Sequence, residues 1–300
     1  MKVTILGNNS ALPAFGRHPT SQAVSVYGEL LLLDCGEGTQ IQMQRFGLRW
    51  RNLHHIFISH MHGDHYFGLP GLINSMSLLG RTAPLYLYGP VSLMPLLQQI
   101  LDLANNKLTY PFQFIPLPAD YAILVDNELF RVSTFPVIHS VPCNGFLIES
   151  KTKGRKLLPE KCKEYEIPAA YYDILKKGED YERKDGFLVK NEWVTEDGPR
   201  PKRYAYCTDT LFTDSFLQHI IGVDTVYHES TYLEADVTKA ASRFHSTAMQ
   251  AAQIAKDANA RQLLLGHFSS KYKDLEPFKM EAATIFQNVE PTVEGTTYDI

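Results

Sequence analysis

The sequence predicts an α/β fold built in layers, with helices packed on the outside of β-sheet. Three observations predict it. Short runs of β-branched and aliphatic residues recur along the chain, stretches with helical spacing stand between them, and 44% of the 300 residues are hydrophobic. That apolar content is enough to bury a substantial core.

Ten apolar runs are predicted to be strands, because each is short, rich in β-forming residues and bounded by turn residues. They are KVTILG, AVSVY, ELLLLDC, HIFISH, PLYLYG, FRVSTFPVIH, GFLIES, RYAYCTD, TVYHES and QLLLGHF.

Five stretches have apolar residues three and four positions apart and are predicted to be helices. In the fourth, Ser246 or Thr247 is the predicted N-cap, and Gln250 stands in capping-box position relative to Thr247. The five are TQIQMQRFG, LPGLINSMSLLG, VSLMPLLQQILDLAN, STAMQAAQIAKDAN and PFKMEAATIFQN.

One segment lacks this periodicity. From Lys151 to about Arg203 the chain is charged and rich in turn residues. We therefore expect a single domain over residues 1–300, with residues 151–193 inserted as a protruding arm.

The bulk composition excludes some classes of function. The net charge is -4 and the pI about 6.3, so binding to a polyanion would need a local basic patch. Four cysteines without CxxC spacing and a start without a signal-like apolar run indicate a reduced, cytoplasmic protein. No apolar stretch is long enough to span a bilayer, so no membrane role is expected.

The histidines are concentrated in one place. Five of the 11 lie between His54 and His65, where ISHMHGDHYFGLPG follows an apolar run. On an extended segment alternate side chains point to one side, and Gly63 permits a turn, so we expect the cluster at the carboxyl end of a strand. Packed without a metal, these polar groups would lack partners. A cluster this dense can begin two Zn²⁺ sites, which suit the hydrolysis of phosphate esters. The candidates are His60, His62, Asp64 and His65.

The motifs around these residues resemble those of a known protein family. HMHGDH resembles the metallo-β-lactamase superfamily. ISHMHGDHYFGLPGL, with LGNNSALP, LLLDCGEGTQ, HSVPCNGF, YCTDT, HEST, FHSTA and GHFSSKY in the same order, resembles ribonuclease Z, the tRNA 3′-processing endonuclease. The resemblance implies an αββα sandwich of two mixed β-sheets flanked by helices. It also implies a zinc-dependent endoribonuclease that removes the 3′ trailer from precursor tRNA and leaves a tRNA 3′-hydroxyl.

The resemblance implies a site with two Zn²⁺ per subunit, with Mn²⁺ as an alternative metal. His60, His62 and His139 would hold one ion, Asp64, His65 and His267 the other, and Asp209 would bridge them. Each of these residues ends an apolar β-like run, which supports their convergence. A hydroxide activated by the metals would attack the phosphodiester, and Asp64 would orient it or accept its proton.

The resemblance also implies that His245, paired with Glu229, protonates the departing oxygen. The residues alone leave other roles open: a solvent-exposed helix start for His245, and a salt-bridged carboxylate for Glu229. Asp34 in LLLDCGEG is equally compatible with anchoring a ligand and with capping a turn.

Contacts to substrate are implied for a further set of cations. Lys271 stands where the family commonly has Arg, so it would act as a point charge and not as a bidentate fork. The arm reads IPAAYY where relatives usually read IPPGP, so the Gly-Pro turn expected at its tip is missing. A solvated charged loop or a dimer contact is the alternative role of the arm. The candidate cations are Arg17, Lys271, Lys153, Arg155, Lys156, Lys176 and Lys177.

The implied partners are precursor tRNA and a second copy of the chain, since the family forms homodimers. The main rival interpretation is a metallo-β-lactamase-fold phosphodiesterase that acts on small phosphodiesters. A non-catalytic RNA- or metal-binding protein is disfavoured by the complete ligand set.

Overall fold

The computed structural model describes residues 1–104, 107–152 and 154–300 and contains two compact units. The first unit comprises Met1–Glu149 and Lys202–Ile300, and the second comprises Ser150–Pro201. The arm expected at residues 151–193 lies within the second unit. In the described part of the chain, no helix has the length and apolar character required to cross a membrane.

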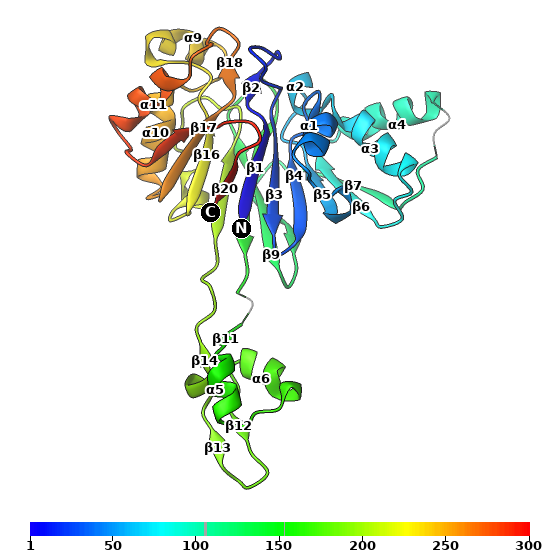
Figure 1. Cartoon of the computed structure of the whole chain (residues 1–300). Helices are drawn as coiled ribbons and strands as arrows, with labels where there is room; N and C mark the ends of the chain where they lie inside the picture. The colour runs from blue at the N-terminus through cyan, green and yellow to red at the C-terminus, as the bar shows by residue number, and fades with distance from the viewer. Residues whose placement is uncertain (105–106, 153) are drawn as a thin grey trace. The chain divides into compact units, whose positions relative to one another are not determined.

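The first unit is built on two seven-stranded mixed sheets (Figure 1). One has the order β20 (Thr297–Asp299), β1 (Lys2–Gly7), β3 (Ser21–Val26), β4 (Glu29–Leu33), β5 (Leu53–Phe57), β6 (Leu85–Gly89) and β7 (Phe112–Pro116). The other has the order β19 (Val289–Pro291), β17 (Gln262–Gly266), β16 (Thr225–Glu229), β15 (Arg203–Cys207), β10 (Cys143–Ser150), β9 (Phe130–Val137) and β8 (Ala122–Asp126).

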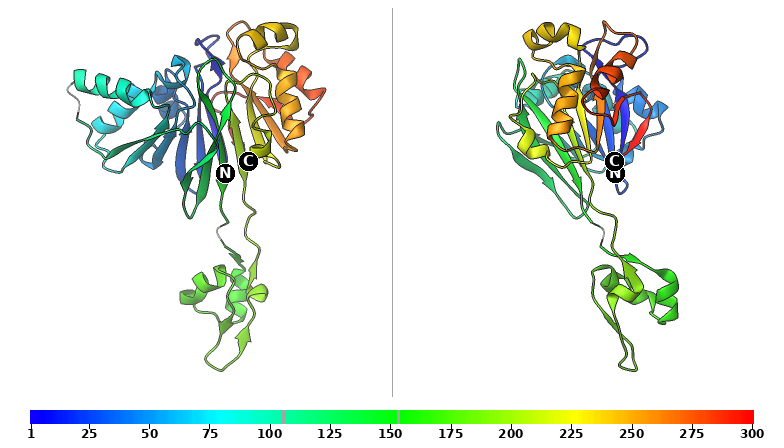
Figure 2. Two further views of the ribbon diagram at one scale, coloured as in Figure 1. Left: turned by 180° about the vertical axis from the view of Figure 1, so that it is seen from behind. Right: turned by 90° about the vertical axis from the view of Figure 1, so that its left-hand side faces the viewer.

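Helices cover the outer face of each sheet (Figures 1 and 2). The first sheet is covered by α1 (Thr39–Arg45), α3 (Leu69–Leu78) and α4 (Leu93–Leu103). The second is covered by α8 (Leu217–Ile220), α10 (Ala248–Asp257) and α11 (Glu276–Ala283). This arrangement confirms the predicted αββα sandwich.

The strand β4 shows why its sequence is apolar throughout. Leu31 and Leu33 pack between the sheets against Phe146 and Tyr206, whereas Leu30 and Leu32 face the helices. Both faces of the strand are therefore buried, and alternation with polar residues is absent.

All ten predicted runs contain a strand and all five predicted stretches contain a helix. The capping box of α10 is confirmed: Thr247 Oγ1 accepts from Gln250 N, and Gln250 Oε1 accepts from Thr247 N at 3.0 Å. The expected end of the third helix, at Asn105, lies outside the described residues. The sequence missed β7, β8, β19 and β20, most of whose residues are only partly buried or exposed.

The histidine cluster differs from the expected extended segment in one respect. A short helix, α2 (Gly63–Tyr66), begins directly after His62 and carries Asp64 and His65. The helical region therefore starts six residues before the predicted start at Leu69, and β5 ends at Phe57, before His60.

The remaining short elements of the first unit are η1 (Trp50–Asn52), η3 (Glu234–Asp236), α9 (Val237–Ser242) and the small sheet of β2 (Asn9–Ser10) and β18 (Phe268–Ser269).

The second unit has a small core of its own. Cys162, Ile167, Leu175, Tyr181, Val189 and Val194 are buried together. Its elements are β11 (Lys156–Leu157), α5 (Pro159–Glu164), η2 (Ala169–Tyr171), α6 (Tyr172–Lys176), β12 (Tyr181–Glu182), β13 (Leu188–Val189), α7 (Asn191–Val194) and β14 (Thr195–Glu196).

Candidate metal centre and active site

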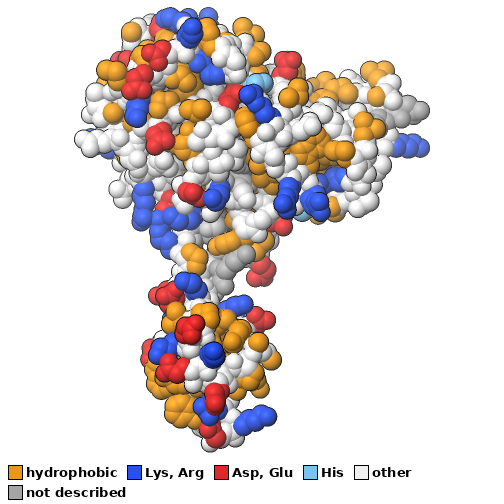
Figure 3. Space-filling view, in the orientation of Figure 1, with side chains coloured by type: hydrophobic (Ala, Val, Ile, Leu, Met, Phe, Trp, Pro, Cys, Tyr) orange, Lys and Arg blue, Asp and Glu red, His pale blue; other side chains and the backbone are white. Residues whose placement is uncertain are grey.

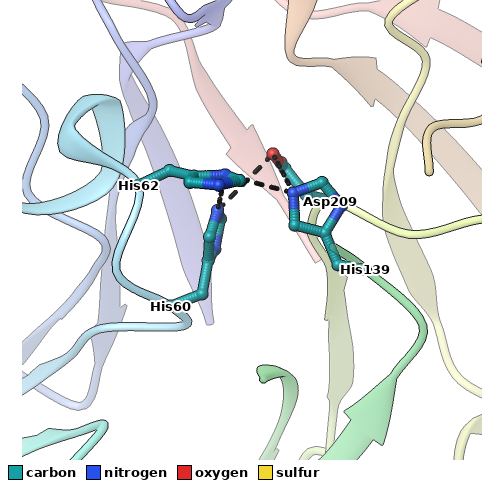
Figure 4. A group of neighbouring side chains, drawn as sticks. All are labelled: His60, His62, His139 and Asp209. Carbon is teal, nitrogen blue, oxygen red and sulfur yellow. Dashed lines mark hydrogen bonds and ion pairs between the residues drawn. The ribbon is translucent and has the colours of Figure 1, made fainter. Parts of the chain in front are cut away.

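Three imidazoles and one carboxylate converge at the carboxyl ends of β5, β9 and β15 (Figure 4). His62 Nδ1 lies 3.1 Å from both His60 Nε2 and His139 Nε2. Asp209 Oδ2 lies 3.6 Å from His60 Nε2 and 3.7 Å from His139 Nε2. These four residues form the first donor set.

A second donor set lies beside it and consists of Asp64, His65 and His267. His65 Nε2 is 3.3 Å from His267 Nε2, and Asp64 Oδ2 is 3.6 and 3.5 Å from these two atoms. Asp209 Oδ1 faces this set, at 3.4 Å from His65 Nε2 and 3.1 Å from His267 Nε2. Asp209 therefore presents one oxygen to each set.

The donor spacing fits a metal ion. Nitrogens about 2.0–2.1 Å from a tetrahedral Zn²⁺ are separated by roughly 3.3 Å, close to the spacings between imidazoles in both sets. Neutral imidazole and carboxylate are also ligands that zinc accepts. The residues present therefore fit one ion in each set, with Asp209 between them.

In four of the five donor histidines the second ring nitrogen has a partner, as expected of metal ligands: His60, His65, His139 and His267. His65 Nδ1 is 2.7 Å from Asp34 Oδ2, and Asp34 also accepts from Ser59 N and Tyr206 Oη. Asp34 therefore anchors His65. Of the two roles that the sequence left open, anchoring a ligand and capping a turn, the structure shows the first. His60 Nδ1 lies 2.9 Å from Ser59 Oγ.

Two of these partners were missed by the sequence analysis. His139 Nδ1 lies 2.9 Å from the carbonyl oxygen of Phe244, and His267 Nδ1 lies 2.9 Å from Thr231 Oγ1. A backbone carbonyl carries no side-chain signal. Thr231 had one weak signal, since it stands in the HEST block that also supplies Glu229.

Opposite charges within the cluster govern its electrostatics. Burial disfavours a charged His65, but the carboxylates of Asp209, Asp64 and Asp34 raise its pKa well above the ordinary value. Burial likewise disfavours a charged Asp209, but His267 and His65 hold the pKa of that carboxyl well below its usual range. The cluster thus keeps its carboxylates ionised.

His245 and Glu229 form a buried ion pair beside the second donor set. His245 Nδ1 is 2.8 Å from Glu229 Oε1, and the Glu229 side chain is fully buried. Burial lowers the pKa of His245, but the charge of Glu229 outweighs it and raises the pKa to about 9. Glu229 also accepts from Thr231 Oγ1 at 2.7 Å. A hydrogen-bonded path therefore runs from His267 through Thr231 and Glu229 to His245.

A cavity of about 490 Å³ gives access to these groups. His62, Asp64, Asp209 and His245 line it, together with the loop at residues 10–13 and Phe67. The loop is attached to the donors, because Ala11 N donates to Asp64 Oδ2 at 2.7 Å.

Two of the predicted substrate cations in the first unit are already engaged. The guanidinium of Arg17 donates to Asn9 Oδ1 and to the carbonyls of Tyr272 and Lys273. Lys271 Nζ donates to Asp236 Oδ2 at 2.6 Å. Both side chains therefore brace the loop after β18, and a substrate contact remains a prediction.

The arm cations are mostly paired as well. Arg155 bonds Asp197, Lys156 bonds Glu196, and Lys176 lies 3.5 Å from Asp173. Lys177 has no ionic partner within the described residues. Lys153 lies outside the described residues.

The most similar curated relatives reported below share one name, ribonuclease Z. The ribonuclease Z of Parabacteroides distasonis is 40% identical over 294 residues, covering 98% of this chain and 97% of that protein. The ribonuclease Z of Porphyromonas gingivalis is 41% identical over 292 residues, covering 97% of this chain and 95% of that protein. Residues 1–153 match the family model described as Anti-Pycsar protein Apyc1.

Solved structures give the same fold. Human tRNase Z, short form, superimposes with a TM-score of 0.72 at 26% identity, covering 100% of this chain and 99% of that one. The metallo-β-lactamase fold protein YhfI from Bacillus subtilis superimposes with a TM-score of 0.70 at 20% identity, covering 99% of both chains. The similarity to YhfI shows the fold alone.

Proposed function

The chain belongs to the ribonuclease Z family, and we propose that it is a metal-dependent endoribonuclease that removes the 3′ trailer from precursor tRNA. The observation that carries the proposal is the convergence of both donor sets on Asp209, beside the pair of His245 and Glu229. The relatives named ribonuclease Z match nearly the full length of the chain, so both the site and the arm fall inside the similarity.

We propose two Zn²⁺ as the cofactor, with Mn²⁺ as an alternative metal. His60, His62 and His139 would hold one ion and Asp64, His65 and His267 the other, with Asp209 shared. Such ions, when bound, supply a nucleophile at neutral pH and offset the negative charge of the phosphodiester. The spacing of the donors supports this assignment.

The chain's own residues then divide the proton transfers. Asp64 lines the cavity and accepts the proton of the attacking water at its carboxylate. His245 has Nδ1 on Glu229, so its Nε2 is the nitrogen that donates a proton to the departing 3′ oxygen of the tRNA. Glu229 keeps His245 protonated and fixes the plane of its ring.

We propose that the unit Ser150–Pro201 binds the tRNA away from the scissile bond. The sequence of this unit has 12 Lys and Arg against 11 Asp and Glu, so its excess of positive charge is small. Figure 3 shows the two charge types interspersed over its visible surface. The unit also has exposed aromatic surface. The rings of Phe187 and Trp193 are exposed, and their centroids lie 6.4 Å apart. Recognition by shape and stacking is therefore better supported than recognition by charge.

A homodimer and a cytoplasmic location complete the proposal. Leu78 and Leu79 at the end of α3 are 80% and 72% exposed, and Leu103 on α4 is 90% exposed, which supports a partner surface there. The four cysteines are free and buried, which supports a reducing compartment.

A 3′-extended precursor tRNA tests the function directly. We expect the metal-loaded protein to cut just after the discriminator base, Asp64→Ala to abolish the cut, and deletion of residues 155–185 to reduce it. An intact precursor, with turnover of small chromogenic diesters that tRNA does not inhibit, would favour the rival phosphodiesterase. The match of residues 1–153 to the Apyc1 model spans the positions of His60, His62 and His139.

A further inference from the structure

Phe67 is an aromatic side chain of the cavity that the proposed chemistry does not use. It is the C-cap residue of α2, the helix that carries Asp64 and His65. Its side chain is 62% exposed although it lines the same cavity as His62, Asp64 and His245. A large apolar surface is thus presented to whatever occupies the site.

The ring is positioned by the turn between two metal donors. A Cβ added at Gly63 would lie 2.1 Å from Phe67 Cε2, so the absence of a side chain at residue 63 lets the ring pack against the backbone there. The ring of Tyr66 meets it edge-on at 5.0 Å. Phe67 therefore has a defined place beside His62 and Asp64.

Leu12 adds a second apolar group to the cavity. It is 61% exposed and belongs to the loop that Ala11 fastens to Asp64. The cavity thus combines donors for a phosphate-binding metal with two large, exposed apolar side chains. A nucleotide fits both features, because its phosphate lies near a planar base that can contact apolar side chains.

We propose that Phe67 stacks on the nucleobase of one of the two nucleotides joined by the scissile phosphodiester, with Leu12 as a second apolar contact. The inference rests on the proposed function, since it needs an RNA substrate at the donors. Every base has a π-face, so such stacking positions an unpaired nucleotide without selecting its sequence. It would let one site cut precursors with different bases at the junction.

Three substitutions separate stacking from simple apolar contact. We expect Phe67→Ala to lower kcat/KM for precursor tRNA by about 5- to 150-fold, the range found for loss of one base–aromatic stack. Phe67→Leu keeps apolar volume without a planar face and should stay impaired, whereas Phe67→Tyr should restore most of the activity. Bound metal and melting temperature should match the wild type in all three, because the side chain is mostly exposed.

Abasic substrates identify the partner of the ring. Precursors lacking the base on the 5′ or the 3′ side of the cut are compared for the wild type and Phe67→Ala. The effect of Phe67→Ala should vanish with one of them, since the ring then has no base to stack on. Ile221→Ala, which removes another exposed apolar side chain elsewhere, is the control and should change nothing.

The possible failures are distinguishable. A Phe67→Ala effect of the same size on all three substrates, or no effect on any, would overturn the stacking proposal while the wild type still cuts precursor tRNA. A wild type that leaves precursor tRNA intact would overturn the proposed function itself, and stacking with it.

Discussion

Glu229 connects the candidate metal ligands with His245, the proposed proton donor. Its carboxylate is fully buried and accepts from Thr231 Oγ1, from Ser246 N and from the His245 ring. Burial raises the pKa of this carboxyl, but the charge of His245 and its hydrogen bond outweigh burial and lower it. A buried carboxylate with this many donors holds both its charge and its geometry.

The first prediction at the residue scale concerns Glu229→Gln. His245 acts in its protonated form, so activity falls as pH rises through its pKa, which Glu229 raises to about 9. Without the negative charge, the basic limb of the kcat profile should move to lower pH by about one unit or more. The measurement is kcat against pH at saturating precursor tRNA, with metal content as control. An unmoved basic limb would assign that limb to another group.

The second concerns the hydroxyl of Thr231, which accepts from His267 and donates to Glu229. We expect Thr231→Val to weaken metal binding about 10- to 100-fold, the usual cost of losing a partner that orients a ligand. Competition with a chelator measures it. Thr225→Val is the matched control, since Thr225 is equally buried and bonds Gln262 at the far end of β16. Equal affinity in both variants would contradict the role of Thr231.

At the scale of elements, strand ends explain what the sequence could predict. Apolar runs such as QLLLGHF identify a buried strand and place His267 at its carboxyl end, where open α/β sheets gather ligands. The edge strand β8 was missed although Ala122 to Val125 are all apolar, because so short an apolar run is ambiguous by pattern alone. Tertiary packing decides which histidine Thr231 and the Phe244 carbonyl contact, so the sequence could not predict these contacts. The same holds for the ion pairs of the arm.

The ion pairs of the arm lead to a prediction about its contact with tRNA. Lys176 and Lys177 are neighbours, but among the residues that the structure describes only Lys176 lies against a carboxylate, that of Asp173. If the arm contacts phosphates, Lys177→Ala should lower the slope of log(kcat/KM) against log salt by a little under one unit, and Lys176→Ala by less. Steady-state kinetics from about 50 to 200 mM salt measure it. Equal slopes for both variants would show that pairing with Asp173 does not matter.

At the scale of the whole first unit, metal should hold the two sheets together. One sheet leads into His60, His62 and the helix with Asp64 and His65, whereas the other supplies His139, Asp209 and His267. Binding at these donors exists only when the sheets are packed, so metal stabilises the folded state by mass action. At a free concentration about 100 times Kd the gain is about 2.7 kcal/mol per ion.

Removal of the metal by a chelator should therefore lower the melting temperature by about 5–10 °C per ion, or about 10–20 °C for two ions, given roughly 2–4 °C per kcal/mol for a unit of this size. Scanning calorimetry of the full chain, with and without chelator, measures the shift. Asp209→Asn removes the charge facing both donor sets, so its own chelator-sensitive shift should be smaller. A melting temperature that stays constant while metal content falls to zero would mean that the donors of both sheets meet without the ions holding them.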